Sequence, residues 1–186
     1  MKQLTTPLTQ EIVSGLSMGD EVLLSGTIYT ARDQAHSRLC ALLEKGEKLP
    51  IDLDGTVIYF AGPTPTPPGR AVGSAGPTTS GRMDAFSPKL IKAGLKGMIG
   101  KGNRSMEVIE AMRLCGAVYF AATGGAGALI ARCIKSSVCV AYEDLGAEAI
   151  YKMEVQDFPM VVAIDSKGEN LYINGPERYR IDRGDI

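Results

Sequence analysis

The chain has 186 residues, a length typical of one domain, and we expect a single domain over residues 1–186. With 45% hydrophobic and 22% charged residues, the composition is that of a globular protein with a core. The 20 basic and 21 acidic residues give a net charge of −1. This balance argues against the global basic field that attracts nucleic acid or an anionic membrane.

We expect neither a leader nor a membrane segment. Residues 1–7 lack the apolar core of a signal peptide. The longest uncharged stretch, residues 114–131, is interrupted by glycines and flanked by arginines, so we interpret it as a buried strand and a turn. We therefore expect a cytoplasmic protein.

Cysteine and histidine are too sparse to predict a metal site. The cysteines are Cys40, Cys115, Cys133 and Cys139, and no two of them have CxxC spacing. His36 is the only histidine. We expect reduced thiols, mostly buried, and no metal site made by this chain alone.

The first clear elements are a strand and a helix in residues 21–46. Residues 21–29 are apolar and β-branched, which predicts a strand. Thr30 and Asp33 then have the spacing of a capping box, and Gly46 is expected to end the helix that follows. Arg32 would lie in the first helical turn, where the helix dipole disfavours a cation. Either Arg32 serves a ligand or it pairs with Asp33.

The rest of the chain alternates predicted strands and helices. We expect strands at 56–61, 95–100, 117–122, 138–142, 160–164 and 171–173. Helices are expected from Ser87 to a stop at Gly94, at 105–114, and from a turn at 123–127 to Lys135. Proline excludes residues 62–69 from a strand, so they form a stiff loop. This alternation predicts an α/β domain with a mixed sheet.

Two glycine-rich segments suggest a site for a small anion. Residues 76–84 read Gly-Pro-Thr-Thr-Ser-Gly-Arg-Met-Asp, and residues 97–102 read Gly-Met-Ile-Gly-Lys-Gly. Glycine lets a ligand approach the backbone, and N–H groups beside Arg82 and Lys101 would cradle a carboxylate or phosphate. The alternatives are helix capping by Thr78 and Thr79, an ion pair between Arg82 and Asp84, and a merely exposed Lys101.

Together with residues 30–36, Thr-Ala-Arg-Asp-Gln-Ala-His, these two segments resemble the C-terminal region of class I fumarases. They are equally similar to the separate beta subunit of iron–sulfur fumarate and tartrate hydro-lyases. Residues 154–159 and 165–168 add to the resemblance. The order and spacing of the motifs match across nearly the whole chain.

The resemblance implies a fold, a reaction and a partner. The implied fold is a swivelling β/β/α domain, a mobile lobe that closes over the cluster-bearing part. The implied reaction is the hydration of fumarate to malate and its reverse, a step of the tricarboxylic acid cycle, or the dehydration of tartrate. A 4Fe-4S cluster acts as the Lewis acid and is ligated by a partner alpha subunit. A homodimer or an alpha2beta2 assembly is expected.

The resemblance also implies roles for five residues. Thr78 and Lys101 would be catalytic, with Thr78 as the base that takes the C3 proton of malate. Arg32 and Arg82 would bind substrate carboxylates through charge-assisted hydrogen bonds. His36 would orient Arg32 or touch substrate. A threonine hydroxyl is a poor base unless a neighbour activates it, and we assign that role to an acidic residue of the partner. With the family considered, Thr79 keeps the capping role.

Two other functions compete with the hydro-lyase. One is a non-catalytic carboxylate-binding or assembly module that kept the pocket, although such a module needs no hydroxyl beside two cations. The other is a phosphate-binding enzyme, which the chain disfavours because it lacks the glycine–lysine spacing of a P-loop. Fumarate and tartrate differ in their hydroxyl groups, and the residues that sense these groups lie partly on the absent subunit.

Overall fold

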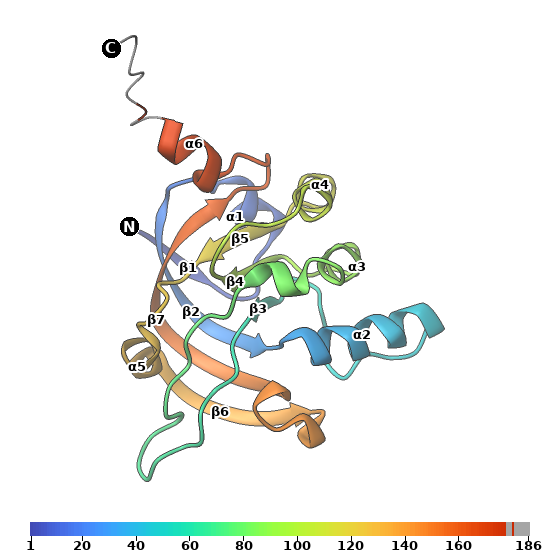
Figure 1. The fold of residues 1–186 in the computed structure, drawn as a ribbon, viewed down its shortest axis with the longest axis vertical. Helices are drawn as coiled ribbons and strands as arrows, with labels where there is room; N and C mark the ends of the chain where they lie inside the picture. The colour runs from blue at the N-terminus through green and yellow to red at the C-terminus, as the bar shows by residue number, and fades with distance from the viewer. Residues whose placement is uncertain (178–179, 181–186) are drawn as a thin grey trace, which may run out of the picture.

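Seven strands form one mixed sheet that closes on itself in the computed structural model, which describes residues 1–177 and 180 (Figure 1). The strands are β1 (Lys2–Thr5), β2 (Glu21–Thr30), β3 (Val57–Tyr59), β4 (Gly97–Gly100), β5 (Val118–Ala121), β6 (Ile134–Ala141) and β7 (Ile150–Ile164). Their order in the sheet is β1-β2-β3-β4-β5-β7-β6, and a further pairing of β2 with β7 closes a barrel.

Strand β7 makes the closure possible because it is 15 residues long. Strands β1 to β5 run parallel to their neighbours, whereas β7 is antiparallel to β2, β5 and β6. Residues 151–161 of β7 pair with β2, residues 150–155 pair with β6, and residues 161–164 pair with β5. One strand therefore joins the two ends of the parallel set.

Three helices lie against one side of the sheet (Figure 1): α2 (Asp33–Lys45), α3 (Ser87–Lys92) and α4 (Met106–Cys115). The shorter helices are α1 (Gln10–Ser14), α5 (Gly127–Ile130) and α6 (Leu171–Glu177), and 3-10 turns occur at η1 (Ser80–Met83), η2 (Ala131–Cys133) and η3 (Glu143–Glu148). In the described part of the chain, no helix has both the length and the hydrophobicity needed to cross a bilayer.

The alternation of side chains along the strands divides the core in two. On β3, Val57 and Tyr59 belong to the cluster inside the barrel, whereas Ile58 packs under the helices. On β5, Phe120 faces the barrel interior and Tyr119 faces the helices. Apolar side chains cover both faces of these strands, as expected for parallel strands buried on both sides. The helix-side layer carries the candidate site on its rim.

The predicted α/β class with a mixed sheet is confirmed, but the predicted capping box is wrong. The N-cap of α2 is Arg32, and no side chain caps this end. The Thr30 hydroxyl instead accepts a hydrogen bond from the Tyr151 backbone N–H at 3.1 Å, because barrel closure brings β7 alongside it. The predicted end of the helix is confirmed, since Gly46 adopts a left-handed conformation with φ 68°.

Three predicted elements differ in the structure. The helix expected to reach Lys135 stops at Ile130 and passes through η2 into β6, whose pairing with β7 requires an extended chain. The strand expected at 171–173 is helix α6, which begins where the Asn170 side chain accepts from the Tyr172 N–H at 3.0 Å. Strand β7 starts at Ile150, well before the predicted 160.

Candidate active site

The site residues expected from the sequence gather where the parallel strands end. Arg32 follows β2, Lys101 follows β4, and the segment from Thr78 to Arg82 enters between β3 and β4. Loops at the carboxyl ends of parallel strands are the usual location of ligand sites in α/β folds. The three segments come from distant parts of the sequence and meet only through the sheet.

Hydrogen bonds fix the segment that carries Thr78. Strands β3 and β4 are still paired where the Phe60 N–H donates to the Ile99 carbonyl at 2.8 Å. Beyond that point the Thr78 N–H donates to the Phe60 carbonyl at 2.7 Å, and the Lys101 N–H donates to the Thr78 carbonyl at 3.3 Å. The Ser80 N–H then donates to the Lys101 carbonyl at 2.9 Å. The segment is therefore inserted between two diverging strands.

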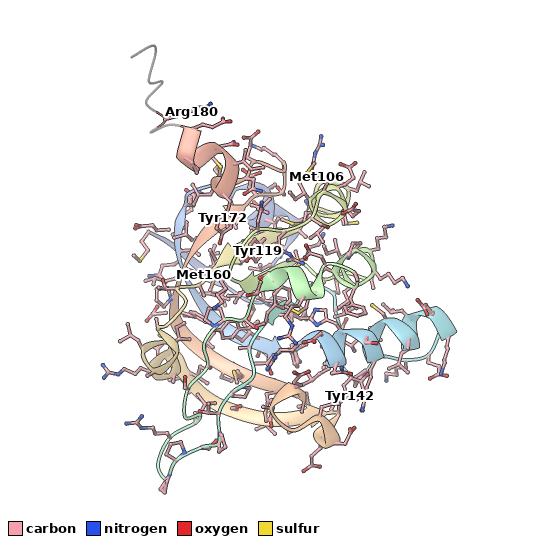
Figure 2. The ribbon with its side chains drawn as sticks, in the orientation of Figure 1. Met106, Tyr119, Tyr142, Met160, Tyr172 and Arg180 are labelled. Carbon is pink, nitrogen blue, oxygen red and sulfur yellow. The ribbon has the colours of Figure 1, made fainter. Side chains whose placement is uncertain are left out.

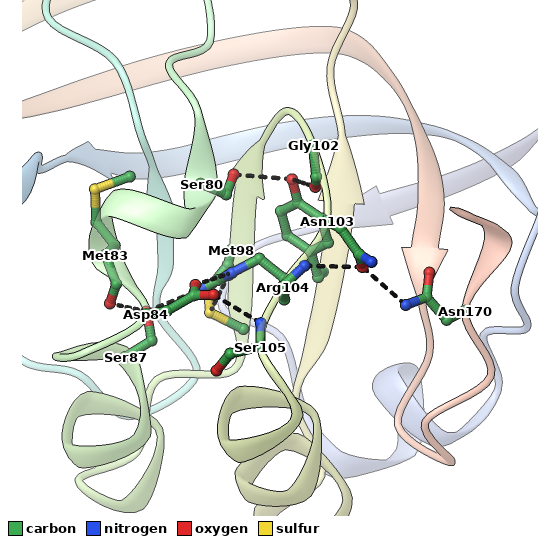
Figure 3. Close-up of polar contacts among 11 residues, drawn as sticks. Ser80, Met83, Asp84, Ser87, Met98, Gly102, Asn103, Arg104, Ser105 and Asn170 are labelled. Carbon is green, nitrogen blue, oxygen red and sulfur yellow. Dashed lines mark hydrogen bonds and ion pairs between the residues drawn. The ribbon is translucent and has the colours of Figure 1, made fainter. Parts of the chain in front are cut away.

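The insertion requires a glycine in the neighbouring strand. A Cβ atom on Gly100 would lie 2.0 Å from the Ser80 hydroxyl and 2.9 Å from the Phe60 ring. Ser80 is buried, and its hydroxyl is 2.8 Å from the Tyr119 hydroxyl, which donates to the Gly102 carbonyl at 2.8 Å (Figure 3). Because Tyr119 uses its proton on Gly102, Ser80 donates to Tyr119.

Thr78 is a half-buried residue, and its hydroxyl is hydrogen-bonded to no described residue. Its backbone N–H and carbonyl are both used to hold the segment in place. Thr79 occupies the N-cap position of η1, but its side chain makes no capping bond. The capping role expected for Thr79 is therefore wrong. The backbone fixes Thr78 while its side chain is left available.

Arg82 forms an ion pair with Asp33, whose Oδ2 lies 2.6 Å from the guanidinium. Burial raises the pKa of Asp33, but its hydrogen bonds with Arg82 and the backbone outweigh this effect, so the pKa of Asp33 lies below its usual value. The alternative pairing of Arg82 with Asp84 is wrong, because Asp84 pairs with Arg104 at 2.7 Å. Asp33 thus joins the start of α2 to the Thr78 segment.

Arg32 pairs with Glu148 of η3, with 3.1 Å between Nη2 and Oε1. The alternative ion pair with Asp33 is therefore wrong. Arg32 Nε and Glu148 Oε2 are both buried, and neither has a hydrogen-bond partner among the described residues. A Cβ atom on Gly62 would lie 3.1 Å from Arg32 Nη1, so the chain after β3 passes close under the guanidinium. Arg32 keeps an unused donor for an anion.

Lys101 is exposed and forms no ion pair with any described residue. A Cβ atom on Gly124 would lie 3.4 Å from Lys101 Cδ, which places the glycine-rich turn after β5 next to the lysine chain. That turn packs on the loop leading to Thr78, because a Cβ atom on Gly127 would lie 2.9 Å from the Gly76 nitrogen.

His36 lies behind the site and is fully buried. Its Nδ1 donates to the Arg32 carbonyl at 2.9 Å, and its ring meets the Phe60 ring edge-on at 5.3 Å. Burial is the main cause that lowers the pKa of His36, to about 4, so the imidazole is neutral. Of the two roles expected for His36, this geometry favours orienting Arg32, because the ring has no exposed surface.

The side chains of the described residues do not fit a 4Fe-4S cluster. The four cysteines are free thiols, with Cys40 buried and the other three half-buried. Burial raises the pKa of the Cys40 and Cys133 thiols. No three His, Cys, Asp or Glu side chains lie together as a metal site within residues 1–177. The cysteines of this part of the chain are therefore not arranged as cluster ligands.

The sequence matches one known family over nearly its whole length. The family model described as "Fumarase C-terminus" matches residues 2–175. The chain belongs to this family. The matched range includes every segment that contributes to the site.

Several curated proteins are similar to this member of the family. It is 42% identical over 174 residues to the aerobic class I fumarate hydratase of Escherichia coli strain K12, covering 92% of this chain and 31% of that protein. It is 41% identical over 162 residues to fumarate hydratase 2 of Leishmania major, covering 86% of this chain and 28% of that protein.

An archaeal relative has nearly the length of this chain. A Methanocaldococcus jannaschii protein, provisionally named as the beta subunit of an L(+)-tartrate dehydratase, is 40% identical over 171 residues. The match covers 89% of this chain and 88% of that protein. The chain thus spans about a third of the fumarate hydratases that it matches but most of the tartrate dehydratase subunit.

The sequence predicts the cations of the site but not the residues that form ion pairs with them. For Asp33 the sequence predicts a place in a capping box or an ion pair with Arg32, although an acid in this position can equally pair with a cation from another segment. Glu148 and Arg104 gave no local signal, because each pairs with a residue from a different element, Arg32 and Asp84 respectively. Contacts of this kind depend on the three-dimensional fold.

Proposed function

We propose that this chain is the beta subunit of an iron–sulfur-dependent hydro-lyase that interconverts fumarate and malate. The observation that carries the proposal is the position of Thr78. Its hydroxyl is unengaged among the described residues, its backbone is fixed by hydrogen bonds to Phe60 and Lys101, and Arg82 lies in the 3-10 turn that follows. A hydroxyl among cations suits a substrate with two carboxylates and a proton to remove.

In this proposal the residues of the chain bind the substrate, orient it and remove its C3 proton. Arg32, whose side chain is partly exposed, and Arg82 would each hold a substrate carboxylate by charge-assisted hydrogen bonds. Lys101, which has no acidic partner among the described residues, would stabilise the negative charge that develops as the C3 proton leaves. Thr78 would take that proton, and His36 would hold the backbone of Arg32 in place.

A partner is required by this assignment. A threonine hydroxyl needs a nearby base to accept its proton, and no described residue makes a hydrogen bond to the Thr78 hydroxyl. We propose that an alpha subunit supplies this base and the 4Fe-4S cluster, which acts as a Lewis acid when bound. The pair would work in the cytoplasm as an alpha2beta2 assembly, and the beta subunit alone would have negligible activity.

Tartrate is the alternative substrate, and the archaeal relative favours it. That protein carries the name of a tartrate dehydratase beta subunit and has nearly the length of this chain. The same relative supports the proposal that this chain is a separate subunit. Both substrates are dicarboxylates, so the roles of Arg32, Arg82 and Lys101 would be the same.

The test is anaerobic co-expression with a cysteine-bearing alpha subunit, followed by assays with malate, fumarate and tartrate. We expect Thr78→Ala to lower kcat by about 10²–10⁴-fold, the range for removal of a general base. Thr79→Ala is the matched control, because Thr79 is the adjacent residue, is exposed and caps nothing. The control should keep wild-type kcat, and the iron content of all three proteins should be equal.

Three outcomes would contradict separate parts of the proposal. Full activity of Thr78→Ala with an intact cluster would remove Thr78 from the reaction but keep the hydro-lyase. Turnover by the isolated beta chain at the rate of the pair would refute the need for a partner. No activity of the wild-type pair on any of the three diacids would favour a binding module.

A further inference from the structure

A buried cation, Arg104, lies behind the candidate active site. Figure 2 shows the side chains of the described residues, and Figure 3 shows the polar contacts around Arg104 in detail. The side chain of Arg104 has no exposed surface, and its Nε lies 2.7 Å from Asp84 Oδ1. Burial lowers the pKa of Arg104, and Asp84 opposes that effect, but a guanidinium stays protonated in proteins. The protein therefore holds a permanent positive charge in its helix-side core.

The contacts of Arg104 define its orientation. Nη2 donates to the Ser87 hydroxyl at 2.7 Å, and Nη1 lies 3.3 Å from the Met98 sulfur. The guanidinium carbon is 5.2 Å from the ring centres of both Phe60 and Tyr119. Hydrogen bonds along its edge and contacts with two rings together restrict the orientation of the planar guanidinium.

Asp84 connects Arg104 to both halves of the site. It lies directly after η1, at the end of the segment that begins at Thr78. Its Oδ1 accepts from Arg104, and its Oδ2 accepts from the Ser105 backbone N–H at 2.7 Å. Arg104 and Ser105 close the loop that begins at Lys101. One carboxylate thus holds the two loops together (Figure 3).

Stability alone gives no reason for a charge at this position. The side chains that contact it include Met98, Phe60 and Tyr119, all fully buried, and apolar replacements of buried ion pairs are often neutral or stabilising. What the ion pair adds is a fixed geometry between two loops. We propose that Arg104 is a positioning residue, which sets the placement of Thr78 and Arg82 relative to Lys101. Its effect on catalysis rests on the proposed function.

The variants for the test are Arg104→Met, which removes the charge and the planar set of hydrogen-bond donors, and Arg104→Lys, which keeps the charge alone. Arg113→Met is the matched control, because Arg113 lies on α4 and pairs only with the exposed Glu110 among the described residues. Backbone hydrogen exchange of the full chain is measured first. We expect amides 78–84 and 101–105 to exchange at least about tenfold faster in Arg104→Met, with β7 unchanged.

The second measurement is kinetic and uses the co-expressed pair. We expect kcat of Arg104→Met to fall about 10–100-fold, because a small misplacement of reacting groups is costly. KM should stay within about threefold, because Arg82 is also held by its ion pair with Asp33 and Arg32 lies outside the two loops. Arg104→Lys should lie between wild type and Arg104→Met, since a lysine cannot donate to Asp84 and Ser87 as a planar fork. The control should match wild type in both measurements.

The outcomes are decisive for the proposal. Faster exchange with unchanged kcat would show a merely structural role and overturn it, as would unchanged exchange in the two loops. If Arg104→Met does not fold, Arg104→Lys carries the test, and wild-type exchange and kcat in that variant would overturn the proposal. If the wild-type pair is inactive on all diacids, the proposed function fails, whereas hydrogen exchange still decides whether Arg104 holds the loops.

Discussion

The burial of His36 predicts a specific loss of stability in mild acid. The pKa of its imidazole is lowered from 6.5 to about 4, chiefly by burial. A group whose pKa is lower in the folded state than in the unfolded state binds its proton first in the unfolded chain. Above about pH 6.5 the burial of the neutral imidazole costs no stability. The free energy of unfolding then decreases as the pH falls from about 6.5 towards about 4. At about 1.4 kcal/mol per pH unit, the whole loss is about 3 kcal/mol.

The measurement compares wild type with His36→Asn, which does not titrate and can still donate to the Arg32 carbonyl. Urea unfolding followed by circular dichroism gives the free energy of unfolding at each pH. Between about pH 7.5 and about pH 5, wild type should lose about 2 kcal/mol more than the variant. His36 is the only histidine in the chain, so the difference has one source. Equal losses would refute the reasoning, as would an NMR titration that gives this imidazole a pKa near 6.5.

Two further predictions concern the supports of the site. Gly100→Ala places a Cβ atom 2.0 Å from the buried Ser80 hydroxyl. We therefore expect a loss of about 1–3 kcal/mol in the free energy of unfolding, measured by urea titration. An unchanged urea midpoint would show that the segment around Ser80 can shift without cost and would contradict this prediction. Asp33→Asn removes the partner of Arg82 and should cost less than about 1 kcal/mol near neutral pH, because the pair is partly exposed. Since the pKa of Asp33 is lowered in the folded state, wild type loses this advantage as the pH falls, and the two proteins should converge in acid. A gap that widens in acid would contradict the assignment.

The sequence was most informative where the backbone conformation requires glycine. The segments 76–84 and 97–102 were predicted to form one site, and the hydrogen bonds of Thr78 and Ser80 with Lys101 place them side by side. Gly46 was predicted to end a helix, and it adopts a left-handed conformation. These features depend on local backbone geometry, which can be predicted from the residue types of a short segment.

The features that were missed depend on distant pairing. Residues 150–159 were not expected to be a strand, because their extended conformation follows from pairing with β2 and β6 rather than from a local pattern. The cap of α2 was placed at Thr30 instead of Arg32, because the Thr30 hydroxyl is used by β7. The partners of Arg32 and Arg82, Glu148 and Asp33, likewise become neighbours only in the folded chain.

The pairing of β2 with β7 has a consequence for synthesis of the protein on the ribosome. Arg32, Thr78 and Lys101 all emerge before β7, whose residues 151–161 pair with β2. Closing so long a loop has an entropy cost, and contacts between distant residues form slowly. The nascent chain therefore carries the site residues for some time before the barrel that arranges them can close. We expect a chain truncated before Ile150 to lack the dicarboxylate binding proposed for the full chain, even though every one of those residues is present.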